Sequence, residues 1–175
     1  MSVSDGVDLA IKQIANTAEM LRLMLGHVAP LDLSWKPQPS RFSHSEILSH
    51  LAHVDEHCFG LRLKRILGED NPELESYDDN SFQSAGSVFT SDGPARLQDF
   101  INCRAKWCDY IATVPRTSLM RSGHHAKLGT VTASEILHIW AFHDLGHIRQ
   151  AAEVLRARPL YAGIGAFQTF YKVRP

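Results

Sequence analysis

Apolar residues recur at spacings of three and four over four long stretches of the chain, and this pattern limits the fold more than any other feature. Such spacing places apolar side chains along one face of a helix, where they can pack against other helices. The pattern predicts helices over about residues 4–27, 43–67, 94–113 and 132–156. We find no convincing run of period two, which is typical of a half-buried strand. We therefore predict an all-α protein whose four helices form one up-and-down bundle.

Capping residues and prolines mark where these helices begin and end. Ser43 with Glu46, and Thr132 with Glu135, have the spacing of capping boxes. In a capping box a hydroxyl and a carboxylate satisfy backbone N–H groups at the start of a helix. Pro30 follows the first helix and cannot continue it. These signals agree with the apolar pattern at the starts of the second and fourth helices.

The length and composition fit one globular domain. The chain has 175 residues, of which 44% are hydrophobic and 21% are charged. These values are ordinary for a globular protein and leave no segment apolar enough to span a membrane, so we expect a single domain over residues 1–175 and no membrane partner. The first residues lack the basic start and apolar run of a secretory signal, and we expect the protein in the cytoplasm.

Charge and cysteine content argue against two kinds of protein. The 18 basic and 19 acidic side chains leave a formal net charge of -1, and no dense basic block occurs. We therefore expect no nucleic-acid partner. The three cysteines contain no CxxC pair, so neither a disulfide framework nor a zinc knuckle is indicated.

Two segments outside the predicted helices have unusual composition. Residues 69–93 are polar, rich in turn residues and longer than the usual connection in a helical bundle, so we expect either a disordered or a functional loop. The tail, residues 157–175, is apolar and aromatic. We expect it to fold over the end of the bundle or onto a partner chain, because its aromatic side chains would otherwise be exposed together.

His143 and His147 are four residues apart, and a helical projection places both on the core side of the fourth helix. On the second helix, His50 is the most inward histidine, whereas His53 points towards solvent. Three imidazoles from two helices can hold one divalent ion and leave a coordination position open for water or substrate. The alternative is that these are core histidines that form ordinary hydrogen bonds.

Asp144 and Arg104 are charged residues on the inward faces of the fourth and third helices. Because an unpaired charge there would be costly, a buried ion pair between them is the structural interpretation. In the functional alternative, Asp144 orients a ligand imidazole, or Arg104 receives an anionic substrate. We interpret Gln150 as part of the helix surface, and His124 and His125 as solvent-exposed loop residues.

Two stretches resemble the DinB-like superfamily of helical bundle proteins. "SHSEILSHLAHVDEH" is similar to the family's capped second helix, and "HHAKLGTVTASEILHIWAFHDLGHIRQAAEVL" is similar to its run with paired ligand histidines. The resemblance implies a four-helix bundle, often a homodimer, with metal ligands at His50, His143 and His147. It implies nickel or zinc as the metal, with iron or manganese as alternatives. His53 stands where many relatives carry Asp.

The site and the resemblance together predict a metal-dependent enzyme that acts on a small molecule, with no catalytic residue identified beyond the metal ligands. Relatives in this family include thiol S-transferases that use bacillithiol or mycothiol. A low-molecular-weight thiol is therefore an expected partner, and thiol transfer or hydrolysis an expected reaction. The alternatives are a metal-binding, stress-related bundle without catalysis and an interaction bundle that binds no metal.

Overall fold

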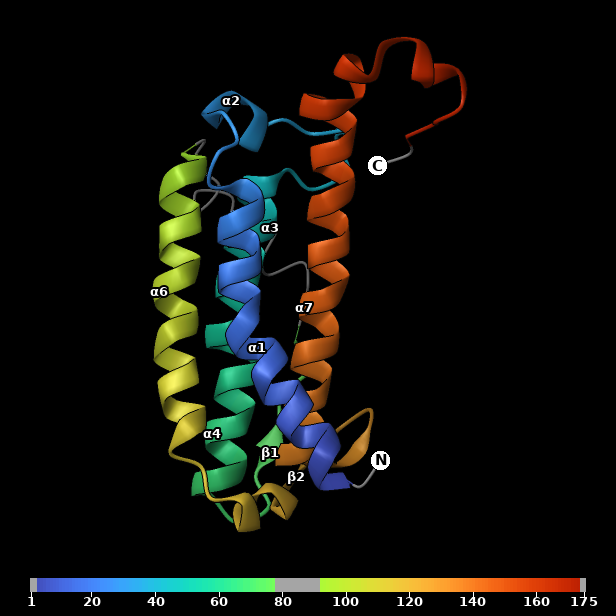
Figure 1. Ribbon diagram of the computed structural model, residues 1–175. Helices are drawn as coiled ribbons and strands as arrows, with labels where there is room; N and C mark the ends of the chain where they lie inside the picture. The colour runs from blue at the N-terminus through green and yellow to red at the C-terminus, as the bar shows by residue number, and fades with distance from the viewer. Residues whose placement is uncertain (1–2, 78–91, 174–175) are drawn as a thin grey trace.

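Four helical rods lie side by side along one axis (Figure 1). The computed structural model describes residues 3–77 and 92–173, and the side chains of residues 3–5 are left aside. The rods are α1 (Val3–Leu25), a continuous rod of α3 (His44–Val54) and α4 (Gly60–Gly68), α6 (Gly93–Ala112) and α7 (Ala133–Leu155). The four-helix bundle predicted from the apolar spacing is confirmed.

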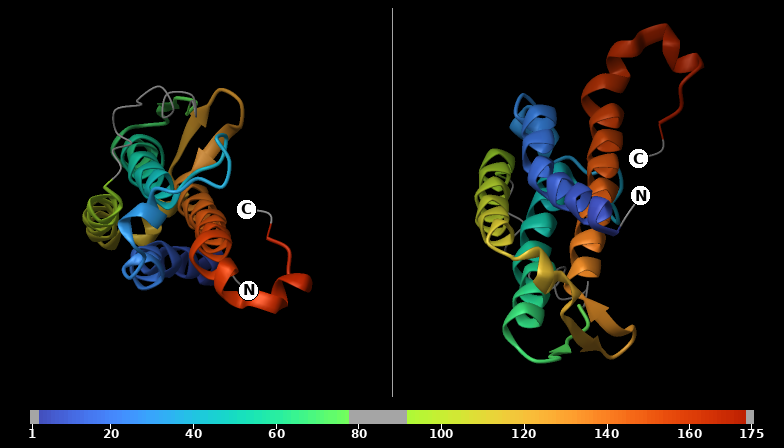
Figure 2. Two further views of the ribbon diagram at one scale, coloured as in Figure 1. Left: turned by 90° about the horizontal axis from the view of Figure 1, so that it is seen from above. Right: turned by 60° about the horizontal axis from the view of Figure 1, so that its bottom comes forward.

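Consecutive rods are not all neighbours in this bundle. Both α1 and α3 pack against α6 and α7, so α1 and the α3–α4 rod lie on a diagonal (Figure 2). In Figure 1, α1 and α7 run upwards, whereas the α3–α4 rod and α6 run downwards. The up-and-down order predicted from the sequence is therefore wrong, because α6 begins at the opposite end from the end of α4.

This arrangement explains the length of the connection between the second and third rods. Residues 69–92 join opposite ends of the bundle, which a short turn between adjacent helix ends cannot do. Most of the connection that the sequence marks as disordered or functional, residues 78–91, lies outside the described part of the chain.

Both predicted capping boxes are present. The Ser43 hydroxyl accepts a hydrogen bond from the Glu46 backbone N–H at 3.2 Å, and the Glu46 carboxylate accepts one from the Ser43 N–H at 2.8 Å. Thr132 and Glu135 form the same pair of bonds at the start of α7. A short helix, α2 (Pro30–Leu33), begins at the proline that was expected to stop the first helix.

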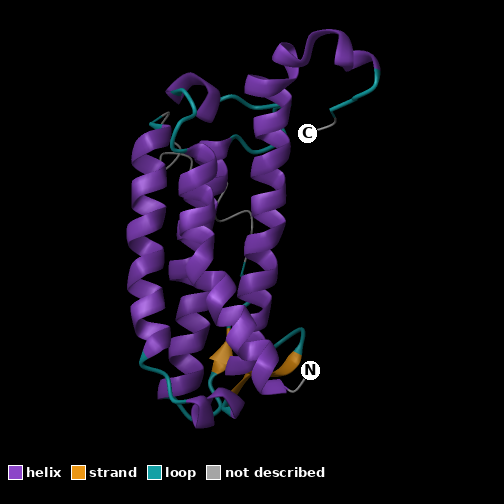
Figure 3. Ribbon diagram, viewed as in Figure 1, coloured by secondary structure: helices purple, strands orange, loops and turns teal. Residues whose placement is uncertain are grey.

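A small sheet, which no run of period two in the sequence predicts, covers the lower end of the otherwise helical bundle (Figure 3). Strand β2 (Ser122–His125) pairs antiparallel with β3 (Gly129–Thr132) and parallel with β1 (Glu73–Leu74). Strands of two to four residues are too short to show a period of two in the sequence. Because β3 ends at Thr132, which caps α7, the hairpin leads directly into that helix.

Two clusters of buried apolar side chains fill the bundle. One surrounds Trp107 and Trp140, and the other contains Leu21, Leu48 and Phe100. These side chains come from the predicted apolar faces of the helices, whose burial is the main favourable contribution to folding. No helix in residues 3–77 or 92–173 combines the length and apolar character needed to cross a membrane.

Most of the tail extends beyond the end of α7 (Figure 1). It consists of a π-helical turn (Arg156–Leu160) and a 3-10 segment (Tyr161–Thr169), within which Gly165 has a φ of 54°. Its first turn contacts the end of the bundle, because Arg158 donates to Asp32 at 3.1 Å and lies over the Trp35 ring. The side chains of Phe167 and Phe170 are 63% and 80% exposed. These two aromatic side chains therefore do not pack over the bundle end, and a contact with a partner chain stays a prediction.

Candidate metal centre

Three histidine nitrogens meet between α3 and α7. The Nε2 atom of His143 lies 3.2 Å from Nε2 of His50 and 3.2 Å from Nε2 of His147. The nitrogens that the three side chains offer all lie within 4.8 Å of one another. The structure thus brings together the three histidines that the sequence predicts as ligands, two from one helix and one from its neighbour.

The spacing of these nitrogens fits a single metal ion. His50, His143 and His147 would hold the ion, each through one ring nitrogen. A donor set of imidazoles alone suits zinc, nickel and other first-row divalent ions.

The three imidazoles are neutral near pH 7, as metal ligands must be. Burial, helped by the neighbouring imidazoles, lowers the pKa of both His50 and His143 to about 3. Burial also lowers the pKa of His147. Clustered imidazolium ions would repel one another in a site that water does not fully reach. The neutral forms leave nitrogen lone pairs for a cation.

Gln150 determines which nitrogen of His147 carries the proton. The amide oxygen of Gln150 lies 2.9 Å from Nδ1 of His147, so Nδ1 donates its proton to that oxygen. Nε2 of His147 then has a free lone pair that points to the other two histidines. The interpretation of Gln150 as helix surface is therefore wrong: it lies three residues after His147, on the next turn of the same face.

A buried charged cluster lies next to the histidines. Arg104 donates to both carboxylate oxygens of Asp55, at 2.8 and 2.9 Å, and to both oxygens of Asp144. It also donates to the backbone oxygen of Ile14 at 2.9 Å. The predicted ion pair between Arg104 and Asp144 is confirmed. Along each helix, these residues lie where one apolar cluster gives way to the other.

The electrostatics of this cluster are strongly coupled. Burial raises the pKa of Asp55 to about 6, against the opposing effect of Arg104. Burial disfavours the charge on Arg104, but the two carboxylates outweigh it and raise its pKa. Arg104 is 1% exposed. Its guanidinium therefore holds α3, α6 and α7 together and is directed at carboxylates, not at solvent.

Asp55 is the residue of this cluster that the sequence interpretation missed. It accepts a further hydrogen bond from the Trp140 indole N–H at 2.8 Å and is fully buried. Its signal in the sequence is its position, four residues after Leu51 and seven after Leu48, which places an acid on the apolar face of the second helix.

The sequence predicts a regular second helix. In the structure this helix contains a π-helical turn at Asp55–Phe59. Such turns widen a helix by one residue and often occur at functional sites. This turn begins at Asp55 and ends at Phe59, whose ring contacts the His143 ring edge-on at 5.2 Å between centroids. On the other side, the Phe42 ring lies 5.7 Å from that of His50. Two phenylalanines thus flank the histidine cluster.

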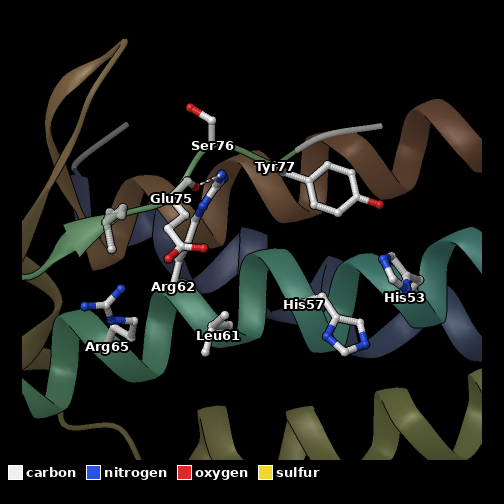
Figure 4. Close-up of a pocket in the computed structure, with 9 residues that line it drawn as sticks. His53, His57, Leu61, Arg62, Arg65, Glu75, Ser76 and Tyr77 are labelled. Atoms are coloured by element: carbon white, nitrogen blue, oxygen red, sulfur yellow. Dashed lines mark hydrogen bonds between the residues drawn. The ribbon is translucent and has the colours of Figure 1, made fainter. Parts of the chain in front are cut away.

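The remaining histidines lie elsewhere. His53 and His57 line a separate cavity of about 570 Å³, in which Arg62 donates to the Glu75 backbone oxygen at 2.7 Å (Figure 4). His125 is buried within strand β2, so its prediction as a solvent-exposed loop residue is wrong. His44 is also buried, and one of its ring nitrogens bonds the Ala151 backbone oxygen at 2.9 Å.

One side of the histidine cluster opens to a cavity of about 710 Å³. His143, His147 and Gln150 form part of its wall, together with Phe142 of the same helix. The volume lies in the usual range for small-molecule sites. A molecule in this cavity would therefore have direct access to two of the three imidazoles.

Comparison with known proteins agrees with this architecture. Residues 13–151 match the DinB superfamily, a span that includes all three histidines of the cluster. The chain belongs to the DinB superfamily. It is also similar to two curated proteins, each named a "putative metal-dependent hydrolase". BH0277 of Halalkalibacterium halodurans is 22% identical over 151 residues, covering 83% of this chain and 85% of that protein.

The second relative and a solved structure extend this comparison. OB0782 of Oceanobacillus iheyensis is 21% identical over 115 residues, covering 65% of this chain and 64% of that protein. The structure of YfiT from Bacillus subtilis matches with a TM-score of 0.74 and 18% identity over 86% of each chain. YfiT is described as "a probable metal-dependent hydrolase with an unusual four-helix bundle topology". At this identity the match shows the fold alone.

Proposed function

We propose that this chain is a metal-dependent hydrolase that holds one divalent ion through His50, His143 and His147 and acts on a small molecule. The observation that carries the proposal is the convergence of three neutral imidazoles, two of which line an open cavity. The names of the two curated relatives support the same reaction class. Nickel or zinc is the proposed metal, with iron or manganese as alternatives.

A divalent ion in such a site supplies Lewis acidity, which polarises a carbonyl oxygen and acidifies water. The chain's own residues prepare the site for that chemistry. Gln150 fixes the protonation of His147, and burial keeps His50 and His143 uncharged. The rings of Phe42 and Phe59 pack against the imidazoles of His50 and His143.

An open coordination position distinguishes this proposal from a purely structural metal site. Structural zinc sites are closed by four protein ligands, whereas catalytic sites keep a position for water or substrate. Among the residues that the structure describes, the metal-binding group contains His50, His143 and His147 and no fourth His, Cys, Asp or Glu side chain. This favours catalysis over the non-catalytic, metal-binding alternative.

Transfer of a low-molecular-weight thiol is the second candidate reaction, because an open coordination position also suits a thiolate. Cys58, Cys103 and Cys108 do not line the cavity beside the histidines. The thiol would therefore come from a second small molecule. A thiol requirement for turnover distinguishes this reaction from hydrolysis, in which water is the nucleophile.

The homodimer expected from the resemblance is also a proposal. Phe167, Phe170 and Tyr171 expose apolar surface on the projecting tail, and contact with a second copy would remove that surface from water. Light scattering would compare the full chain with one that ends at Leu160. A dimer that becomes a monomer on truncation supports the proposal, and an unchanged mass contradicts it.

The central test is elemental analysis of protein purified without chelator and without a polyhistidine tag. Wild type, His143→Ala and His53→Ala are each loaded with nickel, zinc, iron or manganese. We expect about one equivalent of metal in wild type and in His53→Ala, and its loss in His143→Ala, because a missing imidazole leaves two donors. A panel of small esters and amides, with and without added thiols, then tests turnover. Absence of bound metal in wild type, or turnover that survives metal removal, would overturn the proposal.

A further inference from the structure

Two arginines line the cavity that opens beside the histidine cluster. Arg149 lies on α7, two residues after His147, and Arg41 lies in the segment that leads into α3. Arg41 is followed by Phe42, whose ring contacts His50. Although they are far apart in the sequence, the two guanidinium groups therefore belong to the same cavity wall as the imidazoles of α7.

These two guanidinium groups have no partner within residues 3–77 and 92–173. Every other arginine in those ranges donates to a carboxylate or to a backbone oxygen. The carboxylate that lines the cavity, Glu153, is already paired with Arg156 at 2.8 Å. Two positive charges in one concave wall, whose carboxylate is paired with another arginine, attract an anion, and guanidinium groups match the geometry of carboxylate and phosphate oxygens.

The same wall also has an apolar part. Phe142 and Ile139, on α7, line the cavity and are 74% and 46% exposed. Large apolar side chains that stay exposed inside a cavity are suited to an apolar ligand group. The wall thus combines an apolar strip and two free cations with the imidazoles.

We propose that Arg41 and Arg149 bind the oxyanion group, a carboxylate or a phosphate, of the small-molecule substrate, and that its apolar part lies on Phe142 and Ile139. The inference rests on the proposed function, because the histidines are taken as the site of reaction. It assigns the substrate class of the cavity: a small amphiphilic anion whose hydrolysable bond reaches the histidine cluster.

The test measures binding to metal-free protein, so that its result does not depend on turnover. The three probes are hippurate, the neutral methyl ester of hippurate, and phenyl phosphate. In hippurate a benzoyl group is linked through glycine to a carboxylate. Binding is followed by calorimetry or ligand-observed NMR for wild type, Arg41→Met, Arg149→Met and the double variant. Arg22→Met removes an exposed, ion-paired arginine on α1 and is the matched control.

We expect hippurate or phenyl phosphate to bind wild type and Arg22→Met alike, with binding that weakens as salt is added. Each cavity variant should lose about tenfold or more in affinity, the usual effect of removing one charge-assisted hydrogen bond. The methyl ester should bind at least about tenfold more weakly than hippurate for the same reason. The anionic probe that binds wild type with the higher affinity indicates whether the site prefers a carboxylate or a phosphate.

Equal binding of hippurate and its methyl ester, or unchanged binding of both anions in the double variant, would overturn the anion site. Failure of both anions to bind wild type would also overturn it. Metal content is measured on the same variants and should equal that of wild type. Failure to bind metal would overturn the proposed function, whereas failure to bind anions with normal metal content would overturn this inference alone.

Discussion

Arg104 and Asp144 form a two-bond ion pair in the centre of the bundle, and both side chains are at most 1% exposed. The pair joins α6 to α7 next to the histidine cluster, because Asp144 directly follows His143 on α7. Asp55 completes the cluster from the π-helical turn. The stability of the bundle and the placement of His143 therefore depend on the same buried charges.

Replacing Arg104 by Met should strongly destabilise the protein. The change leaves the carboxylates of Asp55 and Asp144 buried without a cation, and losing one partner of a buried ion pair costs about 3–5 kcal/mol. The free energy of unfolding in urea at pH 7 measures the effect. Arg22→Met removes an exposed, solvent-screened ion pair and should leave the free energy of unfolding close to that of wild type. An Arg104→Met protein as stable as wild type would show that the buried cluster is not a stabilising ion pair.

The contact between Gln150 and His147 should control metal affinity. Gln150→Leu removes the acceptor for the Nδ1 proton of His147, and loss of such a partner typically weakens metal binding about 10- to 100-fold. Gln150→Glu keeps an oxygen acceptor and should retain most of the affinity. Competition with a chromophoric chelator gives the dissociation constants. Glu153→Gln, in the same cavity wall, is the control, and equal affinities of Gln150→Leu and wild type would contradict the prediction.

The stability of the metal-free protein should fall as pH decreases from about 7. The pKa values of His50 and His143 are lowered to about 3 in the folded state, so from the ordinary value of 6.5 downwards the unfolded chain binds protons that the folded chain does not. Stability is therefore lost on acidification, by an amount on the order of 2 kcal/mol for each histidine between pH 7 and 5. Denaturant unfolding in the presence of chelator measures this slope.

A double variant, His50→Gln with His143→Gln, provides the control for the pH prediction. It should lose most of the slope between pH 7 and 5. The raised pKa of Asp55 contributes with the opposite sign, because its folded form retains a proton up to about pH 6, but it is present in both proteins and cancels in the difference. Identical slopes in the two proteins would show that the imidazoles are not held neutral by burial.

Gly60 should not tolerate alanine. A Cβ atom at this position would lie 2.3 Å from the Trp107 ring and 2.4 Å from the Asp55 backbone oxygen. Alanine normally favours a helix over glycine by up to about 1 kcal/mol, but overpacking against a buried ring typically costs about 1–3 kcal/mol, so we expect net destabilisation. Gly146→Ala, on α7 with no atom within 4 Å of the added Cβ, should be neutral or stabilising. Thermal unfolding of both variants checks the contrast.

The sequence predicts the parts of this fold that depend on local periodicity. The capping boxes at Ser43 and Thr132 are formed as expected, and His50, His143 and His147 occupy the inward faces that the helical projection assigns them. These predictions succeed because hydrogen bonds within three residues, and the direction of a side chain on a regular helix, follow from the helical repeat alone.

The parts that were missed depend on contacts between distant residues. The order of the rods around the bundle depends on which apolar faces pack together. These faces have similar apolar patterns in the sequence, so the sequence does not predict the diagonal placement of α1. The π-helical turn changes the face of Asp55 to Phe59 by one residue, which a projection of a regular helix does not include. Gln150 was misplaced because its role depends on one hydrogen bond to His147.

The separation of the three histidines along the chain sets when the site can exist. His50 precedes His143 by 93 positions. During synthesis the His50 imidazole therefore leaves the ribosome long before those of His143 and His147. Until then α3 cannot pack against α7. On the proposed function, a nascent chain could not hold a cation with all three imidazoles until α7 has been made, so metal loading would follow the packing of α7 against α3.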